Sequence, residues 1–121
     1  MAIYTDLSVY KSSYDLLITL YKQTKNLPRE YKFTIGERLK NEITAMMIAV
    51  YKANKTRNEK KYEQIELARE HIEVIRLLVR ILKDLHVWSL KQFSILSFRI
   101  EEISKQLSQW SKYTFKQKSQ S

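Results

Sequence analysis

Residues 63–85 read EQIELAREHIEVIRLLVRILKDL, and this stretch decides the fold. Apolar residues recur in it at steps of three and four, which is the period of one face of an α-helix. They form a seam with heptad spacing: Ile65, Ala68, Ile72, Ile75, Val79 and Leu82. A long helix with a continuous apolar seam packs against other helices, so the stretch indicates a helical bundle.

A second apolar row runs beside this seam and consists of Leu67, Val74, Leu78, Ile81 and Leu85. Together the two rows cover an arc of roughly 200°, whereas an amphipathic surface helix needs little more than about 100°. Ile95 and Phe98 also lie off the seam of a later helix. Left exposed, these residues would form a large apolar patch, so we expect a homo-oligomer that buries them between subunits. The alternative is a thicker bundle in which a connector or the tail covers the row.

Basic residues line the edge of the apolar face of the same helix. Four of them fall within roughly 60° of one another around the helix: Arg69, Arg76, Arg80 and Lys83. The acidic residues occupy the neighbouring sector: Glu66, Glu70, Glu73 and Asp84. A helix that only needs to be soluble usually mixes the two signs at i,i+4, so this separation predicts a surface that binds an anionic partner.

The composition limits the possible classes of protein. With 121 residues, the chain fits one domain whose core needs neither disulfides nor metal. It has no cysteine, one glycine and one proline, which argues against turn-rich sheets and glycine-rich phosphate loops. Lys and Arg number 22 against 13 Asp and Glu, and the formal charge of +9 favours nucleic acid, an acidic protein or a membrane surface as partner. A basic protein whose charge serves no specific purpose is the plainer alternative.

Helical periodicity predicts four helices, over about residues 6–25, 35–55, 59–85 and 90–112. The expected seam of the first helix is Leu7, Tyr10, Tyr14, Leu17 and Tyr21. The expected seam of the second is Leu39, Ile43, Met46, Val50 and Ala53, and that of the fourth is Phe93, Leu96, Ile100, Ile103, Leu107 and Trp110. Placed in a core, the tyrosines of the first helix pack there with their hydroxyls at the rim, rather than stacking nucleic-acid bases.

Short polar segments separate the helices. The predicted N-terminal caps are Thr5 or Asp6, Thr34 with Glu37, Asn58, and Ser89 with Gln92. Pro28 ends the first helix, and Gly36 permits a close backbone approach. Short connections make neighbouring helices antiparallel, so residues 1–112 are expected to form an all-α, up-down-up-down four-helix bundle. The basic tail over 113–121 has no seam and is expected to be disordered.

Catalysis and metal binding have weak support in the residues. Arg80 and His86 have the spacing R-x5-H of the helical HEPN ribonucleases, but His86 is also favourable at a helix C-terminus for electrostatic reasons alone. His71 is expected at the surface or at the boundary of the core rather than as a ligand, and no Glu-x-x-His pair recurs on a second helix, so we expect neither metal nor cofactor. With no signal-peptide pattern and no apolar run near 20 residues, the protein is expected to be soluble and cytoplasmic.

Three segments resemble a known family: TKNLPREYKFTIGERLKNE (24–42), AREHIEVIRLLVRILKDL (68–85) and SLKQFSILSFRIEEISKQLSQW (89–110). They are similar to the accessory variability determinant (Avd) proteins of diversity-generating retroelements. The wider relatives of that family are the proteins encoded by intervening sequences in bacterial 23S rRNA genes. The resemblance covers residues 10 to 110 and is distributed rather than confined to one motif.

The resemblance implies an accessory protein and not an enzyme. The resemblance implies a homopentameric barrel. It also implies binding of a reverse transcriptase and its template RNA during mutagenic cDNA synthesis, and DNA is a further candidate ligand. The resemblance assigns the partner-binding role to Arg76 and Arg80 in IRLLVRIL (75–82). Arg69 and Lys83 are added only because they lie in the same basic sector of the helix. An intervening-sequence protein with another role is the first alternative, and a HEPN-like ribonuclease is the second.

Overall fold

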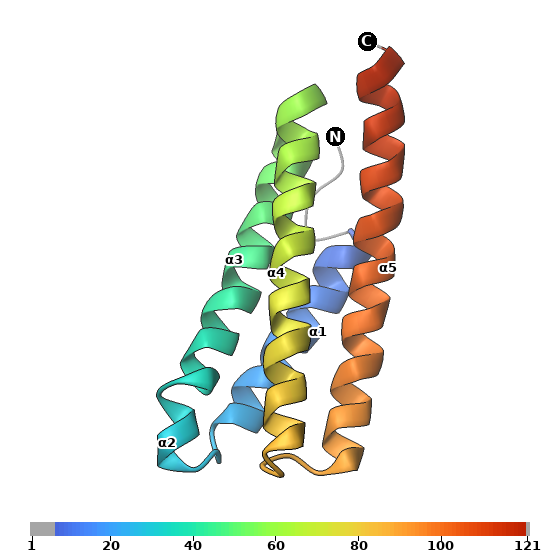
Figure 1. Ribbon diagram of the computed structural model, residues 1–121. Coiled ribbons are helices and arrows are strands. Elements are labelled where there is room, and N and C mark those ends of the chain that lie inside the picture. Colours follow the sequence, from blue (N-terminus) through green and yellow to red (C-terminus); the bar gives the residue numbers. More distant parts are fainter. Residues whose placement is uncertain (1–6, 121) are drawn as a thin grey trace.

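A computed structural model describes residues 7–120, with side chains through residue 117. Its elements are α1 (Ser8–Thr24), α2 (Arg29–Lys32), α3 (Ile35–Lys55), α4 (Asn58–Asp84) and α5 (Leu90–Gln120). The four long helices run alternately up and down, and α2 is a short turn between α1 and α3 (Figure 1). The predicted all-α four-helix bundle is therefore confirmed.

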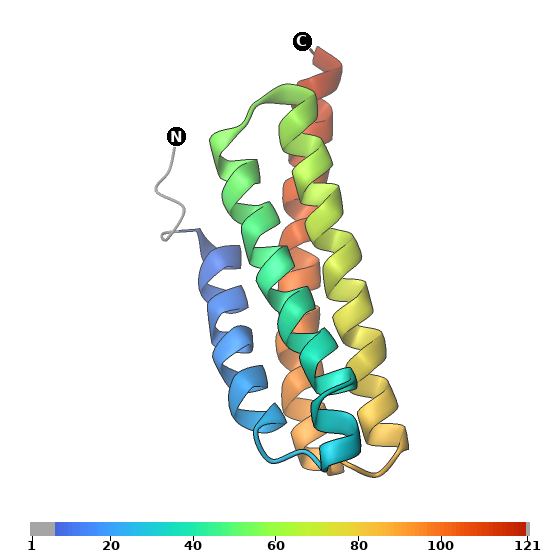
Figure 2. The ribbon, with the colours of Figure 1, turned by 90° about the vertical axis from the view of Figure 1, so that its left-hand side faces the viewer.

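The long helices stand at the corners of a square, in the order α1, α3, α4, α5. Figure 2 shows α1, α3 and α4 side by side, with α5 behind them. Each pair of neighbours meets along an edge of the bundle, and we name these edges after their helices. The α1/α3 edge lies opposite the α4/α5 edge, and the α3/α4 edge lies opposite the α5/α1 edge.

The predicted seams of α3, α4 and α5 supply the core. The six residues of the α4 seam are its only described buried positions. All five seam residues of α3 are buried, and so are the four inner seam residues of α5, while Phe93 and Trp110 at its ends are half-buried. At about 25 cal/mol for each Å² of apolar surface removed from water, these contacts are the main source of stability.

The predicted seam of α1 is wrong by about one position. The helix instead buries Val9, Ser13, Leu16, Leu20 and Thr24. Tyr14 and Tyr21 are 48% and 47% exposed. Ser13 and Thr24 can be buried because their hydroxyls donate to backbone carbonyls of their own helix, at 2.6 Å and 3.4 Å. Because two of the five buried residues of α1 are polar, the apolar pattern in the sequence does not reveal which face is buried. The tyrosines lie at the surface, where their hydroxyl groups remain hydrated.

One predicted cap is confirmed at the start of α5. The Gln92 amide donates to Ser89 Oγ at 3.1 Å, and the Ser89 amide donates to Gln92 Oε1 at 2.9 Å. These two reciprocal bonds satisfy amides that the helix itself cannot pair. Thr5 and Asp6, the predicted caps of α1, lie outside the described residues.

The predicted capping box of Thr34 and Glu37 does not form, although Thr34 has the predicted N-cap position, and Asn58 is not the cap of α4. Thr34 precedes α3 but makes no side-chain cap, because its hydroxyl donates backward to the Glu30 carbonyl at 2.7 Å. Asn58 lies inside the first turn of α4 with φ of 58°, and Arg57 takes the cap position. Asparagine tolerates this left-handed conformation better than most residues, which explains its place at the tight α3–α4 turn.

Gly36 lies in the first turn of α3 and permits a close approach, as predicted, and the segment that approaches it is the connection after α1. A Cβ at this position would be 3.2 Å from Leu27 Cδ1 and 3.2 Å from the Tyr31 carbonyl oxygen. Both distances are tighter than ordinary van der Waals contact, so the missing side chain allows the α1–α2–α3 connection to fold against the helix.

The prediction of a disordered tail is wrong for its described part, because α5 continues to Gln120. Ser111 and Thr114 are buried, and the Phe115 ring lies 5.6 Å from the Tyr62 ring of α4, centre to centre. Ser111 and Thr114 follow Leu107 at steps of four and three, so they continue the seam of α5. The sequence pattern ends at Trp110 because these continuing residues are small and polar.

Candidate functional site

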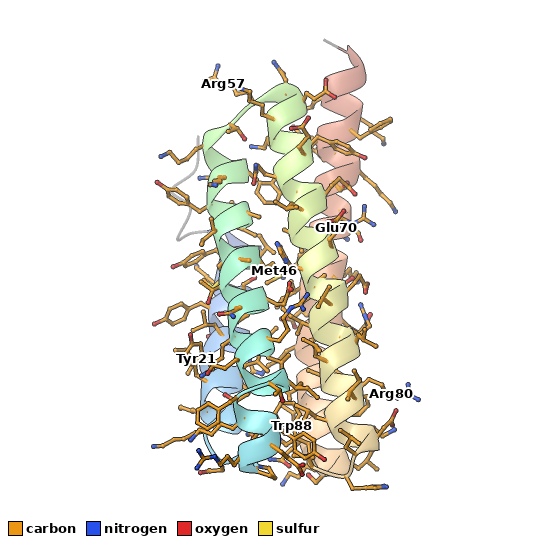
Figure 3. All side chains as sticks on the ribbon, turned by 60° about the vertical axis from the view of Figure 1, so that its left-hand side comes forward. Tyr21, Met46, Arg57, Glu70, Arg80 and Trp88 are labelled. Atoms are coloured by element: carbon orange, nitrogen blue, oxygen red, sulfur yellow. The ribbon has the colours of Figure 1, made fainter. Side chains whose placement is uncertain are left out.

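The four predicted partner-binding residues lie along the α4/α5 edge. A groove follows this edge, and we call it the α4/α5 groove. Arg69 lines its upper part beside Ser104 of α5. Arg76 and Arg80 line its lower part, nearer the end of α4. The Lys83 ammonium lies 4.9 Å from the centre of the Phe93 ring. Figure 3 shows Arg80 on the outer side of the lower part of α4. The structure therefore brings together the residues that the sequence grouped by helical spacing.

The arginines of this groove are paired with carboxylates. Arg69 lies 2.9 Å from Glu66, and Arg80 lies 3.2 Å from Asp84. Arg76 pairs with Glu73 at 2.9 Å and also with Glu101 of α5. The basic and acidic sectors of α4 are therefore not electrically separate, and the anionic partner that their separation predicted stays a prediction. Adjacent sectors of a helix are i,i+3 and i,i+4 neighbours, so the two stripes neutralise each other.

The positive charge of the chain lies mainly outside α4. The helix carries six Lys or Arg and six Asp or Glu, so its formal charge is zero. Residues 7–57 carry ten basic and four acidic residues, and residues 90–120 carry six and two. Phosphate binding depends on net positive charge, so the surfaces formed by α1, α3 and α5 favour it more than the α4 stripe does.

Glu66 fixes the upper end of the groove. Burial alone would raise the pKa of the Glu66 carboxyl, but the hydroxyl of Ser111 and the guanidinium of Arg69 outweigh burial and lower it. The Ser111 hydroxyl donates to Glu66 Oε1 at 2.5 Å. An ionised Glu66 thus holds Arg69 on one side and α5 on the other.

An exposed leucine lines the groove together with the two central arginines. Leu77 is 59% exposed and lines the groove with Arg76, Arg80, Phe93 and Ile100. Sequence reasoning missed Leu77, because it belongs to neither apolar row of α4. Its position between two arginines that were already candidates was the available signal. The groove therefore offers apolar surface bordered by paired charges.

The predicted oligomer residues form two patches rather than one. His71 bonds to Glu42 of α3 and so marks the α3 side of α4. Leu78 lies two helical turns beyond His71 on the same side. Its row follows the α3/α4 edge, with Val74, Leu78 and Ile81 half-buried and Leu67 and Leu85 exposed.

The second patch lies across the bundle from the first. Ile95 and the 70% exposed Phe98 line a hollow with Glu102. Glu102 accepts a hydrogen bond from Ser12 of α1 at 3.4 Å, so this patch belongs to the α5/α1 edge. Residues that looked like one patch in the sequence are separated because they lie on opposite sides of two neighbouring helices.

The two histidines have different surroundings. His71 is half-buried, at the boundary rather than at the open surface, and bonds to Glu42. His86 is exposed at the C-terminal end of α4 with φ of 59°, near Lys83 and Trp88. Among the described residues, no three His, Cys, Asp or Glu side chains are grouped as a metal site. No described helix has both the length and the apolar character that a membrane span needs.

Comparison with known proteins places the chain in a family. A family model described as bAvd-like matches residues 7–114. Among solved structures, the chain is similar to a protein of unknown function from the S23 ribosomal protein family of Bacteroides thetaiotaomicron. The TM-score is 0.79 and the identity 16%, with 86% of this chain and 95% of that chain covered, so this likeness concerns the fold alone. A search of curated proteins found no match. The family model spans nearly the whole bundle, and the chain therefore belongs to the bAvd-like family.

Proposed function

We propose that the protein is a non-catalytic accessory subunit of a diversity-generating retroelement. In this role it binds the reverse transcriptase and its template RNA during mutagenic cDNA synthesis. Membership of the bAvd-like family carries the proposal. The α4/α5 groove supports it, because this groove gathers the residues that the resemblance associates with partner binding.

The groove suits a protein partner better than a phosphate backbone. Its arginines are already paired with carboxylates, so their charge is largely cancelled before a ligand arrives. Leu77 offers an apolar anchor in the hollow that Arg76 and Arg80 also line. Protein interfaces typically combine a desolvated apolar or arginine anchor with a polar rim. We therefore assign the groove to the reverse transcriptase.

RNA binding in this proposal depends on the overall charge of +9. Lysines and arginines neutralise phosphates and release counterions, which gives affinity without sequence readout. The sequence that is copied would then be chosen by the polymerase or by the RNA structure.

The two apolar patches support assembly into a closed ring. Contact between different patches of neighbouring subunits is heterologous, and such contacts close into rings when the rotation allows. The α3/α4 patch and the α5/α1 patch are different surfaces on opposite edges, so one subunit can contact a neighbour on each side, as in a head-to-tail ring. The resemblance sets the expected number of subunits at five. Repeated copies of a weak RNA contact would then strengthen one another.

Charge reversal tests the groove. The double variant Arg76→Glu, Arg80→Glu should weaken association with the reverse transcriptase at least tenfold, measured by co-purification and by titration. Leu77→Ala should weaken it without changing any charge, and circular dichroism verifies the fold of each variant. The control Lys22→Glu, Lys25→Glu, compared like the other variants on nuclease-treated samples, removes as much positive charge from the end of α1, away from the groove. Equal losses in the two charge-reversal variants would mean that the groove is not the polymerase site.

Genomic context gives an independent check on the biological setting. A reverse-transcriptase gene and a paired template and variable repeat beside this gene would support the retroelement role. Their absence would favour an intervening-sequence protein with another function.

A further inference from the structure

The α1/α3 edge exposes a row of large side chains that are mostly tyrosines. Tyr14, Ile18 and Tyr21 follow one another at steps of four and three, so they share one face of α1, and all three are exposed. The Tyr10 ring stacks on Tyr14, with 6.4 Å between ring centres and 25° between planes. We call these four residues, together with Tyr51 of α3, the tyrosine face.

Lysines of α3 approach the same rings. The Lys40 ammonium lies 5.4 Å from the centre of the Tyr21 ring, and the Lys55 ammonium lies 4.8 Å from that of Tyr51. The Lys55 ammonium also donates to the Tyr51 hydroxyl at 2.9 Å. Aromatic rings and ammonium groups therefore lie next to one another on this edge.

The tyrosine face is continuous along the edge. The contact between Lys40 and Tyr21 fixes the level of α3 against α1. Tyr51 lies eleven residues beyond Lys40, and Tyr10 lies eleven residues before Tyr21, on helices of opposite direction. At about 1.5 Å per residue, Tyr10 and Tyr51 reach nearly the same level, and the face extends for about 16 Å.

The tyrosine face belongs to the basic part of the molecule. Lys11 and Lys25 share the side of α1 that bears Tyr14 and Tyr21. Among the residues that the structure describes, neither lysine forms an ion pair with a carboxylate, unlike the arginines of the α4/α5 groove. Figure 3 shows Tyr21 and Arg80 on opposite sides of the bundle.

We propose that the tyrosine face binds single-stranded nucleic acid, with bases stacked on Tyr14 and Tyr21 and phosphates held by the neighbouring lysines. Aromatic rings in a basic surface are the chemistry that single strands use, because every base has a π-face and stacking tolerates any sequence. A duplex keeps its bases paired and stacked, so it cannot use the rings in this way. The inference shares with the proposed function the premise that the protein binds nucleic acid, but its site is separate from the polymerase groove.

Two opposite sites would let one subunit hold both partners. In a ring whose subunits meet at the α3/α4 and α5/α1 edges, the α4/α5 groove and the tyrosine face remain free. They would then face opposite surfaces of the ring wall. A strand on one surface would not compete with a polymerase on the other.

Fluorescence anisotropy with labelled ten-nucleotide oligo(U) and oligo(dT), and with a duplex of the same length, tests the site. Tyr14→Ala with Tyr21→Ala should weaken binding of the single strands at least tenfold, because stacking contributes substantially to each base contact. Tyr14→Phe with Tyr21→Phe keeps the rings and should remain within about twofold of the native protein. Tyr113→Ala, which alters a 61% exposed tyrosine of α5 outside this face, should have no effect.

Salt dependence provides a second measure. Each phosphate contact contributes about −0.7 to the slope of log affinity against log salt for a single strand. Lys11→Gln with Lys25→Gln should therefore make the slope shallower by up to about 1.4. Binding of both oligo(U) and oligo(dT), or of oligo(U) alone, supports the site, and the second result adds a contact to the 2′-hydroxyl.

Four results would overturn the inference. The first is single-strand affinity unchanged in the double alanine variant. The second is duplex binding as tight as single-strand binding and equally sensitive to that variant. The third is a smaller assembly of that variant in light scattering, which would make the face a contact with a second copy. The fourth is a native protein that binds the reverse transcriptase but no oligonucleotide, which would remove the RNA part of the proposed function and leave the groove intact.

Discussion

His71 Nδ1 lies 2.5 Å from Oε2 of Glu42, and this contact joins α4 to α3. The other carboxylate oxygen of Glu42 accepts from Arg38 Nε at 2.8 Å. Burial alone would raise the pKa of the Glu42 carboxyl, but hydrogen bonds and charges from His71 and Arg38 outweigh burial and lower it below 4.5. Glu42 is therefore an ionised, buried link between two helices of the core.

Glu42 should make the free energy of unfolding decrease at low pH. A carboxyl whose pKa is lower in the folded state stabilises that state above its unfolded pKa of 4.5, and the contribution is lost as pH falls through the folded pKa. Glu42→Gln should lower the free energy of unfolding at pH 7 by about 1–3 kcal/mol and flatten its decline below about pH 4.5. Urea unfolding followed by circular dichroism at several pH values measures both effects.

Glu37→Gln is the matched control for Glu42. Glu37 pairs with Lys40 at 2.7 Å on the same helix, but its side chain is more exposed. A surface pair of this kind contributes at most about 1 kcal/mol. If the two variants lost equal stability with the same pH profile, the link between α3 and α4 would have no special role.

Substitutions of Thr114 test whether the C-terminal end of α5 packs against the bundle. The residue is buried, and its hydroxyl has no hydrogen-bond partner among the residues that the structure describes. Thr114→Val keeps the shape and removes the unsatisfied group, so it should stabilise the protein by about 1 kcal/mol. Thr114→Ser keeps the hydroxyl, loses a methyl group and should destabilise it. Thermal unfolding distinguishes the two, and no change in either variant would mean that this turn does not pack.

Sequence pattern predicted the fold where buried residues are apolar. The α4 seam is complete because all six of its members are aliphatic. In α1 and at the end of α5, buried serine and threonine interrupt the pattern. Their hydroxyls bond locally in α1, to the Val9 and Tyr21 carbonyls, and this pairing cannot be seen in residue spacing. The same local preference explains why the Thr34 hydroxyl bonds to Glu30 and leaves the amides of α3 without its cap.

The sequence predicted which basic residues line the α4/α5 groove, but it did not predict that carboxylates pair with the arginines. Helical spacing alone placed Arg69, Arg76, Arg80 and Lys83 on one line, and the structure keeps them there. Whether a neighbouring carboxylate pairs with an arginine depends on side-chain geometry and on Glu101 from another helix. The tyrosine face was hidden for a related reason, since a tyrosine fits the apolar pattern of a core while its hydroxyl favours the surface.

Gly36 should resist replacement by a larger residue. Gly36→Val would press a branched side chain against Leu27 and the Tyr31 carbonyl, because even its Cβ would lie only 3.2 Å from each of them. Overpacking of this kind costs about 1–3 kcal/mol, and the backbone carbonyl cannot rotate away as a side chain can. Thr44→Val, which introduces the same side chain at an exposed site of α3, should stay within about 0.5 kcal/mol of the native protein. Urea midpoints measure the difference, and equal midpoints would mean that the α2 turn adjusts freely.

The proposed head-to-tail ring and a symmetric dimer differ in how they should respond to a charge placed on one patch. Leu67→Glu places a charge on the α3/α4 patch, and Phe98→Glu places one on the α5/α1 patch. Both side chains are exposed in the protomer, so neither change should unfold it. Each variant alone should be monomeric in light scattering, because every contact of a head-to-tail ring uses both patches.

A mixture of the two variants should form a heterodimer and stop there. The Leu67→Glu protein keeps an intact α5/α1 patch, and the Phe98→Glu protein keeps an intact α3/α4 patch, so one native contact can form between them. The remaining patches both carry the new charge and cannot continue the ring. A mixture that stays monomeric would indicate that each patch binds its own copy, and assemblies that persist in either single variant would exclude that patch from the interface.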